Sequence, residues 1–200
     1  MAVVLNWLGP ELAGTLSRLA RLAGMLPTLN CERLTLRAWT PADVDALFDL
    51  YSRWDVVRYL GTTPTVMTDP AQAVEKIATR NAFTGPMHGV WAIVPNGEDR
   101  PVGTALLTLL PHSHTRGPSA DTEVGWHLHP DVWGHGYATE AGGRLLAHAW
   151  PHGLKEVFAV TYPENAPSQA VCSRLGMAPL GMTDRYYDTS CALFRADRPA

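Results

Sequence analysis

The segment Leu128–Ala141 (LHPDVWGHGYATEA) has the pattern with the clearest chemistry. In it, Gly134 and Gly136 stand between the end of a predicted strand and the start of a predicted helix. Glycine lets the backbone approach a ligand closely and adopt positive φ, and the unpaired amides at a helix N-terminus attract anions. The pattern therefore predicts an anion site, with a pyrophosphate as the expected ligand. A tight connection that binds nothing would have the same pattern, so the spacing alone leaves both interpretations open.

Two better-known phosphate motifs do not fit this segment. A dinucleotide fingerprint needs a third Gly or Ala at position 139 and an acidic residue at the end of the next strand. The chain has Thr139 and Tyr162 at these positions. A Walker A loop needs Gly-Lys followed by Ser or Thr, which the sequence lacks. The turn is therefore not expected to belong to either of these nucleotide-binding folds.

The elements that must position this turn follow from the spacing of apolar residues. Alternation of apolar and polar residues predicts strands, and apolar residues three or four positions apart predict helices. The predicted strands are Arg33–Trp39, Trp91–Val94, Val102–Leu110, Asp121–His129, Val157–Tyr162 and Arg185–Phe194, and the predicted helices are Thr40–Ser52, one that begins at Asp69, Tyr137–Trp150 and Asn165–Leu175. This order predicts one α/β domain with a mixed sheet, in which the second and third strands form a hairpin.

The composition excludes several classes of protein. Of the 200 residues, 46% are apolar and 18% charged, which excludes a disordered chain, and a net charge of −3 gives no bulk reason to bind nucleic acid or an anionic membrane. Three cysteines (Cys31, Cys172 and Cys191) without a CxxC pair argue against a disulfide scaffold or a cysteine–zinc site and favour a reducing compartment. No apolar run approaches the roughly 18 residues of a membrane span, and the start of the chain is a poor secretory signal. We therefore expect a cytoplasmic protein.

Residues 1–30 differ from the rest of the chain. Glu11–Met25 places leucines three or four positions apart with arginines between them, which predicts a short amphipathic helix. This helix could dock on the domain, pair with another subunit or form a loosely attached leader, and the sequence leaves these alternatives open. We expect the compact domain to span residues 31–197 and the protein to be a monomer or a homodimer.

Three segments of the sequence together resemble a known family. A strand with PVG, then EVGWHLHPDVWGHGYATEA (Glu123–Ala141), then ENAPSQAVCSRLGM (Glu164–Met177) occur in the order and at the spacing of the GNAT acyl-CoA-dependent N-acetyltransferases. The sequence is most similar to the branch that acetylates the N-terminal amines of ribosomal proteins. The resemblance covers roughly Glu32–Phe194, which is nearly everything after the N-terminal extension.

The resemblance implies an α/β (α+β) GNAT fold, a single domain with a curved mixed sheet and helices on both faces. Its central strands, here Glu123–His129 and Val157–Tyr162, would splay apart to admit acetyl-CoA. The amides of the glycine turn would hold the pyrophosphate, with Asn165 and Ser168 near the pantetheine arm and the thioester sulfur. The cofactor-binding residues implied in this way are Leu128, Trp133, Gly134, His135, Gly136, Tyr137, Ala138, Thr139, Asn165 and Ser168.

Glu123 is the candidate general base of such a transfer, acting through water. Because a free α-amino group has a pKa near about 8 and is already partly neutral at about pH 7, only modest acid–base help is needed. Glu123 and His127 share one face of the predicted strand at a separation of roughly 13 Å, so they cannot form a direct dyad. The alternative for Glu123 is a carboxylate in water or paired with an arginine.

Ser168 is the candidate group that donates to the leaving sulfur. Many members of the family place a tyrosine as general acid where this chain has Cys172, which shifts the role to Ser168 or to no acid at all. Ser168 could equally bond back to its own helix, and Asn165 could simply be an N-cap.

Histidine spacing raises a metal hypothesis, but His112-x-His114 and His127-x-His129 do not amount to three or four convergent ligands, and no HExxH motif is present. Solvated or substrate-rim histidines and no metal are expected, which leaves a metal-dependent hydrolase a distant alternative. The leading interpretation is an enzyme that moves an acetyl group from acetyl-CoA to a primary amine in a ternary complex, with a protein N-terminus, an amino acid or another small amine open as the acceptor. The rival interpretation is a catalytically weak acyl-CoA-binding sensor of the same fold.

Overall fold

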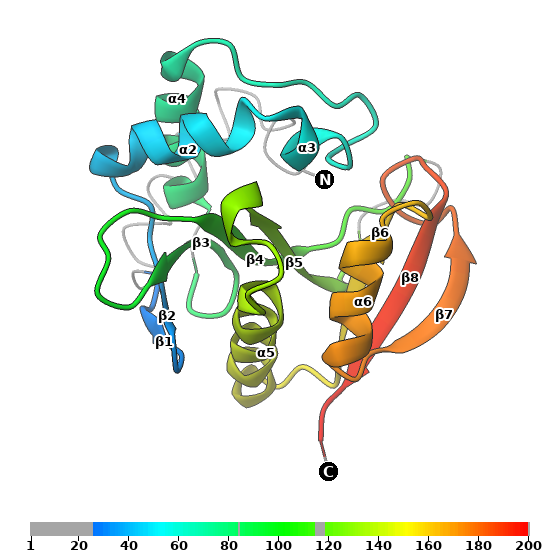
Figure 1. Cartoon of the computed structure of the whole chain (residues 1–200). Helices are drawn as coiled ribbons and strands as arrows, with labels where there is room; N and C mark the ends of the chain where they lie inside the picture. The colour runs from blue at the N-terminus through cyan, green and yellow to red at the C-terminus, as the bar shows by residue number, and fades with distance from the viewer. Residues whose placement is uncertain (1–25, 84, 115–118, 200) are drawn as a thin grey trace.

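The fold is a mixed β-sheet with helices on both of its faces (Figure 1). The computed structural model describes residues 26–83, 85–114 and 119–199. Within them the strands are β1 (Leu29–Asn30), β2 (Leu34–Arg37), β3 (Gly89–Pro95), β4 (Gly103–Leu109), β5 (Thr122–Leu128), β6 (Glu156–Thr161), β7 (Ala178–Thr183) and β8 (Cys191–Asp197). The α-helices are α2 (Val44–Tyr51), α3 (Trp54–Val57), α4 (Pro70–Ala82), α5 (Tyr137–Ala149) and α6 (Ala166–Arg174), with 3-10 turns η1 (Pro41–Asp43), η2 (Pro130–Val132) and η3 (Trp150–His152).

The described strands form one eight-stranded sheet in the order β1-β2-β3-β4-β5-β6-β8-β7. All neighbours are antiparallel except β5 and β6, which run parallel and are joined through η2, α5 and η3. The β3–β4 pair is the predicted hairpin, with Trp91 opposite Ala105. The glycine turn therefore lies between the end of β5 and the start of α5, next to the only described pair of parallel strands.

The two faces of the sheet bury different side chains of the same strand. On β3, Trp91 and Ile93 pack in the core beneath α5, whereas Ala92 and Val94 pack against α2, α3 and α4. This alternation leaves β3 buried along its whole length, as expected for a central strand that is covered on both faces. Figure 1 shows α2, α3 and α4 grouped over one part of the sheet, and α5 and α6 beside each other along β5, β6 and β8.

A third cluster of buried hydrophobic side chains packs near β6 and β8. Phe158 and Val160 of β6 and Leu193 of β8 pack with Tyr186 and Tyr187, which lie in the connection between β7 and β8. On the opposite face of β6, Val157 and Ala159 belong to the core under α5. The β7–β8 connection thus contributes two buried aromatic side chains to the neighbourhood of the β5–β6 gap.

The predicted final strand Arg185–Phe194 is wrong in its bounds. Residues 185–189 form a turn in which Tyr187 and Asp188 have φ of 59° and 51°, and β8 begins only at Cys191. The edge strand β7 was not predicted, because its exposed sequence contains Pro179 and a bulge near Gly181 instead of an alternating pattern.

The other predicted elements are found within a few residues of their expected bounds. The helix expected at Thr40 begins as η1 and becomes α-helical only at Val44, and the short elements β1 and α3 were not predicted. The predicted helix Glu11–Met25 lies outside the described residues. Leu26 and Leu29 pack in the core under α5, and the Trp91 indole donates to the carbonyl of Pro27 at 2.8 Å. In the described part of the chain, no helix combines the length and the apolar character that a membrane crossing requires.

Candidate active site

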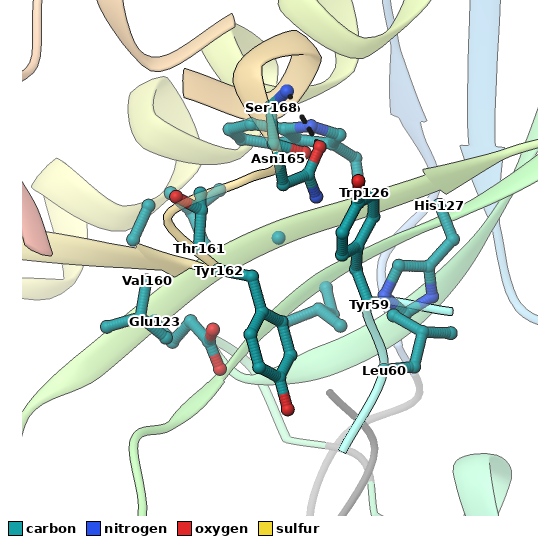
Figure 2. A pocket seen from close by; sticks show the side chains of 14 residues that line it. Tyr59, Leu60, Glu123, Trp126, His127, Val160, Thr161, Tyr162, Asn165 and Ser168 are labelled. Carbon is teal, nitrogen blue, oxygen red and sulfur yellow. Dashed lines mark hydrogen bonds between the residues drawn. The ribbon is translucent and has the colours of Figure 1, made fainter. Parts of the chain in front are cut away.

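The site lies where β5 and β6 separate. The two strands are paired at a single position, Glu123 opposite Phe158, and diverge beyond it. A small cavity of about 60 Å³ lies between them, lined by Glu123, residues 124–127 of β5 and the end of β6 (Figure 2). A larger cleft of about 600 Å³ adjoins it, lined by the glycine turn, the start of α5, and α3 and α6. Both hollows are lined by Tyr59, Leu60, Trp126, His127, Asn165 and Ser168. The gap expected between the central strands is therefore present and leads to the glycine turn.

The glycine turn has unpaired backbone donors. Gly134 and Gly136 have φ of 80° and 82°, which side-chain-bearing residues rarely adopt. The amides of residues 134–139 donate to no other described residue, whereas the amide of Trp133 donates to the carbonyl of Pro130 at 3.0 Å. A Cβ at Gly134 would meet nothing within 4 Å. The turn thus offers an open row of donors, which begins at Gly134 and not at Trp133 as expected.

An arginine outside the expected site holds this turn in place. The Arg33 guanidinium donates to the carbonyl of His135 at 2.9 Å and to the Glu140 carboxylate at 2.8 Å, and it lies over the ring of Tyr137 at 5.3 Å. The amide of Arg33 also donates to Glu140 at 2.7 Å. Glu140 is in the first turn of α5, where its charge would repel an anion, so Arg33 both compensates that charge and fixes the turn. Local spacing gives no signal for this pair.

The expected cofactor-binding residues are brought together, with one exception. The large cleft is lined by Leu128, Trp133, Gly134, Gly136, Tyr137, Ala138, Thr139, Asn165 and Ser168. His135 does not line it, and its Nδ1 lies 3.0 Å from the carbonyl of Trp133. Arg174, at the end of α6, lines the cleft and donates to the Thr139 hydroxyl at 3.2 Å. It places a cation beside the row of free amides, and sequence reasoning missed it.

The Glu123 carboxyl is buried, with 5% of the residue exposed. It is therefore not a solvated carboxylate at a strand end, and its described partner is not an arginine. Oε2 accepts a hydrogen bond from the hydroxyl of Tyr187. Burial raises the pKa of Glu123 from 4.5 to about 7, although the Tyr187 hydrogen bond lowers it. Oε1 makes no hydrogen bond to a described residue, and Glu123 lines the small cavity. A carboxyl that is half ionised near neutral pH suits a general base.

His127 is a second ionisable group of the cavity that sequence reasoning did not assign. Its Nδ1 is 2.8 Å from the Tyr51 hydroxyl, which accepts a hydrogen bond from the buried Arg80 guanidinium at 2.7 Å. Burial lowers the pKa of His127 well below 6.5, and the charges of Arg80 and Lys76 lower it further. The ring is therefore neutral at physiological pH and lies on the face of β5 that also carries Glu123.

Asn165 and Ser168 open α6 at the junction of the two hollows (Figure 2). The Asn165 side chain accepts a hydrogen bond from the amide of Ser168 at 3.3 Å, so it is an N-cap as well as a lining residue. Among the described residues the Ser168 hydroxyl has no hydrogen-bond partner, whereas Ser173 bonds back to its own helix at 3.1 Å. Ser168 is thus not tied to its helix and remains available to a ligand.

Cys172 does not line either hollow. Its side chain is fully buried in the core under α5, and burial raises the pKa of its thiol to about 12. A buried thiol that lines neither hollow cannot act there as a general acid.

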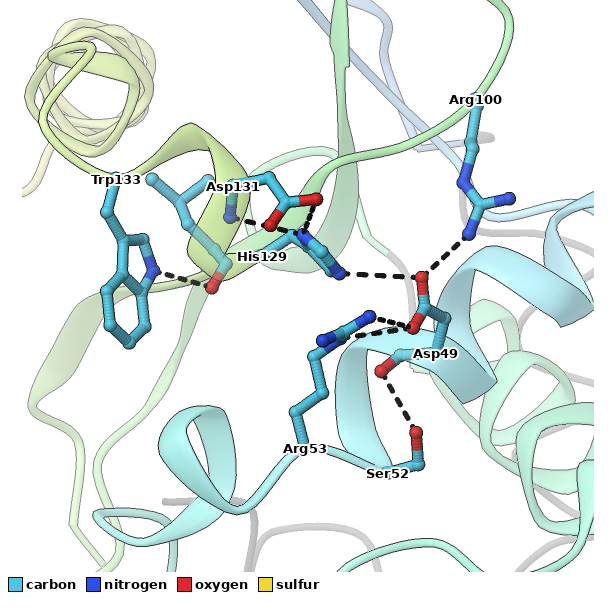
Figure 3. Close-up of polar contacts among 8 residues, drawn as sticks. Asp49, Ser52, Arg53, Arg100, His129, Asp131 and Trp133 are labelled. Atoms are coloured by element: carbon cyan, nitrogen blue, oxygen red, sulfur yellow. Dashed lines mark hydrogen bonds and ion pairs between the residues drawn. The ribbon is translucent and has the colours of Figure 1, made fainter.

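A charged cluster joins α2 to the residues that directly follow β5 (Figure 3). Asp49 of α2 pairs with Arg53 at 2.7 Å, with Arg100 at 2.9 Å and with His129 at 3.4 Å. Burial raises the pKa of Asp49, but the arginine hydrogen bond and the surrounding charges outweigh it, so the pKa is lowered overall. The Trp133 indole donates to the carbonyl of Leu128 at 2.9 Å. These contacts fix the segment that enters the turn.

The histidine pairs of the sequence do not form a metal site. His112 and His114 lie near Asp121 and Asp188 and line neither hollow. His127 and His129 have the separate partners described above. Within the described parts of the chain, no group of three or more His, Cys, Asp or Glu side chains is placed to hold a metal ion.

Comparison with known proteins agrees with this geometry. The family model for the acetyltransferase (GNAT) domain matches residues 33–178. An uncharacterized N-acetyltransferase of Bacillus subtilis, YoaA, is 28% identical over 175 residues, which is 83% of this chain and 95% of the relative. An acetyltransferase structure from Agrobacterium tumefaciens has a TM-score of 0.68 and 25% identity, and the match covers 88% and 96% of the two chains. The structure of RimL, a ribosomal L7/L12 alpha-N-protein acetyltransferase in complex with coenzyme A, has the same fold, with a TM-score of 0.69 at 15% identity over 86% and 98% of the chains.

Proposed function

The chain belongs to the GNAT acetyltransferase family, and on that premise we propose that it transfers an acetyl group from acetyl-CoA to a primary amine. The amine attacks the thioester directly while both substrates are bound. A protein N-terminus, an amino acid or another small amine is the class of acceptor. RimL is named for the first of these, which makes a peptide N-terminus the first acceptor to test.

The observation that carries the proposal is the row of unpaired amides at residues 134–139. These donors stand at the N-terminus of α5, where the helix dipole adds to their attraction for a diphosphate. Arg174 contributes a nearby cation, and the cleft of about 600 Å³ runs from the turn to the β5–β6 gap. The residues present therefore fit the diphosphate and pantetheine parts of acetyl-CoA.

In the proposed reaction the amine nitrogen attacks the thioester carbonyl carbon, so a C–N bond forms and the C–S bond breaks. Glu123 takes the proton of the amine through a water molecule in the small cavity, which its pKa of about 7 permits near neutral pH. The Ser168 hydroxyl donates to the departing sulfur. Because a thiol has a pKa near about 8.5, this donation is a modest part of the acceleration and positioning is the larger part.

Acetyl-CoA binding tests the placement of the diphosphate. Asn and Asp both tolerate the left-handed conformation of Gly134 and have nearly the same shape, so Gly134→Asp and its control Gly134→Asn differ mainly in charge. We expect calorimetry to show that Asp weakens acetyl-CoA binding at least about tenfold more than Asn, since it places an anion beside the phosphates. Equal affinities of the two variants would refute the placement.

Release of free CoA thiol tests the catalytic part. The wild-type protein, acetyl-CoA and a panel of peptide N-termini, amino acids and small amines are followed with DTNB. An enzyme releases thiol with at least one acceptor, and Glu123→Gln lowers that rate while acetyl-CoA still binds. A sensor would bind acetyl-CoA with the same affinity and release no thiol with any acceptor.

A further inference from the structure

The turn between β7 and β8 packs against the face of β6 that is opposite the core under α5. Its Tyr187 is 5% exposed, and the Tyr187 hydroxyl donates to Oε2 of Glu123 across 64 positions of sequence. The neighbouring Tyr186 points its hydroxyl at Asp121 instead, at 2.7 Å. Two adjacent tyrosines of one turn therefore donate to different carboxylates. Of these two carboxylates, that of Glu123 lines the cavity and that of Asp121 does not.

This turn has a strained backbone that the surrounding structure holds in place. Tyr187 and Asp188 both have positive φ, which is unfavourable for residues with side chains and concentrates at functional positions. The Ser113 hydroxyl accepts from the amide of Asp188 at 3.2 Å and donates to the carbonyl of Asp184 at 2.6 Å. The amide of His114 donates to the Asp188 carboxylate at 3.0 Å. Ser113 and His114, which follow β4, thus fix the conformation that aims Tyr187 at Glu123.

We propose that Tyr187 is a positioning residue for the acetyl transfer: its hydroxyl holds one oxygen of the Glu123 carboxyl, so that the other oxygen stays directed at the cavity where the amine must arrive. This inference rests on the role proposed above for Glu123. An untethered carboxylate on β5 could rotate away from the cavity. The tether removes that freedom before the substrates bind, which is the preorganisation that a water-mediated proton transfer needs.

The hydrogen bond from Tyr187 also shifts the pKa of Glu123. Burial raises its pKa, and the Tyr187 hydroxyl counteracts this because it donates to the ionised form. Among the described residues, the Cys191 thiol of β8 also interacts with Glu123, and its own pKa is raised to about 11 by burial and by Glu123. His127, Tyr59 and Tyr162 line the same cavity as Glu123. The strand partners of Glu123, Thr108 on β4 and Phe158 on β6, carry no ionisable side chain. Among the described residues, Tyr187 therefore donates the hydrogen bond that lowers the pKa of Glu123 against the effect of burial.

Tyr187→Phe tests the proposal by direct titration of Glu123, with Tyr186→Phe as the matched control. The Glu123 carboxyl is followed by ¹³C NMR in glutamate-labelled protein, and its signal is assigned with Glu123→Gln. We expect Tyr187→Phe to raise the pKa of Glu123 by on the order of one pH unit and Tyr186→Phe to leave it in place. This reading needs no acetyl transfer, so it can fail or succeed independently of the proposed function.

The pH profile of kcat/KM with an accepted amine is the second reading. A rise of about one unit in the pKa of the base lowers kcat/KM roughly fivefold at about pH 7 and leaves it little changed above about pH 9, with the KM for acetyl-CoA unaltered. If Tyr187→Phe does not fold, Ser113→Ala loosens the same turn and leaves the hydroxyls of Tyr186 and Tyr187 in place. We then expect a smaller rise in the pKa of Glu123.

Two results would overturn the proposal. One is a Glu123 titration that is unchanged in Tyr187→Phe, or shifted equally in Tyr186→Phe, because then the hydrogen bond has no specific effect on the carboxyl. The other is a shifted titration with an unshifted kcat/KM profile, because then Tyr187 holds Glu123 but Glu123 does not limit the transfer.

Discussion

Keeping Glu123 buried beside the cavity should make the protein less stable as the pH rises. The pKa of this carboxyl is raised from 4.5 to about 7 in the folded protein. Between these two values the folded state binds more protons than the unfolded state, so the free energy of unfolding falls as the pH rises through this window. Below the window the effect is absent, and above it the full loss remains.

Glu123→Gln removes this dependence. The amide keeps an oxygen that accepts from Tyr187 but cannot ionise, so the variant escapes the cost of burying a charge. At about 1.4 kcal/mol for each unit of pKa, the difference in unfolding free energy between variant and wild type should change by about 3 kcal/mol from about pH 4 to about pH 9, in favour of the variant at high pH. The buried location of Glu123 justifies using the shift without a discount for solvent screening.

Urea unfolding of both proteins at several pH values, followed by circular dichroism, measures this difference. Subtracting one protein from the other cancels the contribution of every other titrating group, since both proteins share them. The expected curve is flat below about pH 4.5, slopes to about pH 7 and is flat again above it. A difference that stays constant within about 0.5 kcal/mol across the range would show that Glu123 is not a buried carboxyl with a raised pKa, and the reasoning about the base would fail with it.

Two further predictions concern the cofactor side of the site, and a third concerns the buried thiols. Ser168→Ala should lower kcat about tenfold and leave the KM for acetyl-CoA within about twofold, as read from steady-state thiol release; a larger effect on KM than on kcat would assign Ser168 to binding instead. Arg33→Met should weaken acetyl-CoA binding about fivefold because Glu140 then faces the diphosphate uncompensated, and the double variant with Glu140→Gln should recover part of the loss in calorimetry. The three cysteines should react slowly with DTNB at about pH 8 in the folded protein, because burial raises the pKa of each thiol to about 11 or above. In urea all three should react fully. A thiol that reacts fast in the folded protein would contradict that burial.

The predicted bounds were accurate where local rules decide the structure. Asp69 caps α4 with Pro70 at its first position, as the sequence indicates, and the β3–β4 hairpin follows from apolar alternation on both sides of a turn. The rules failed at β7, whose Pro179 and exposed side chains are tolerated because it is an edge strand. They also failed at Tyr187, an aromatic residue with high strand propensity that is held in a left-handed turn.

The sequence by itself determined the glycine turn and the helix that follows it, because both depend on neighbours within a few positions. It also supplied Glu123 and Ser168 as candidates through their places in recognisable segments. Only the tertiary structure decided what these side chains experience. Arg33 reaches Glu140 across 107 positions and Tyr187 reaches Glu123 across 64, and burial of the carboxyl depends on which strands the sheet places beside it. Hydrogen bonds and desolvation of this kind arise from strand order, which no local pattern encodes.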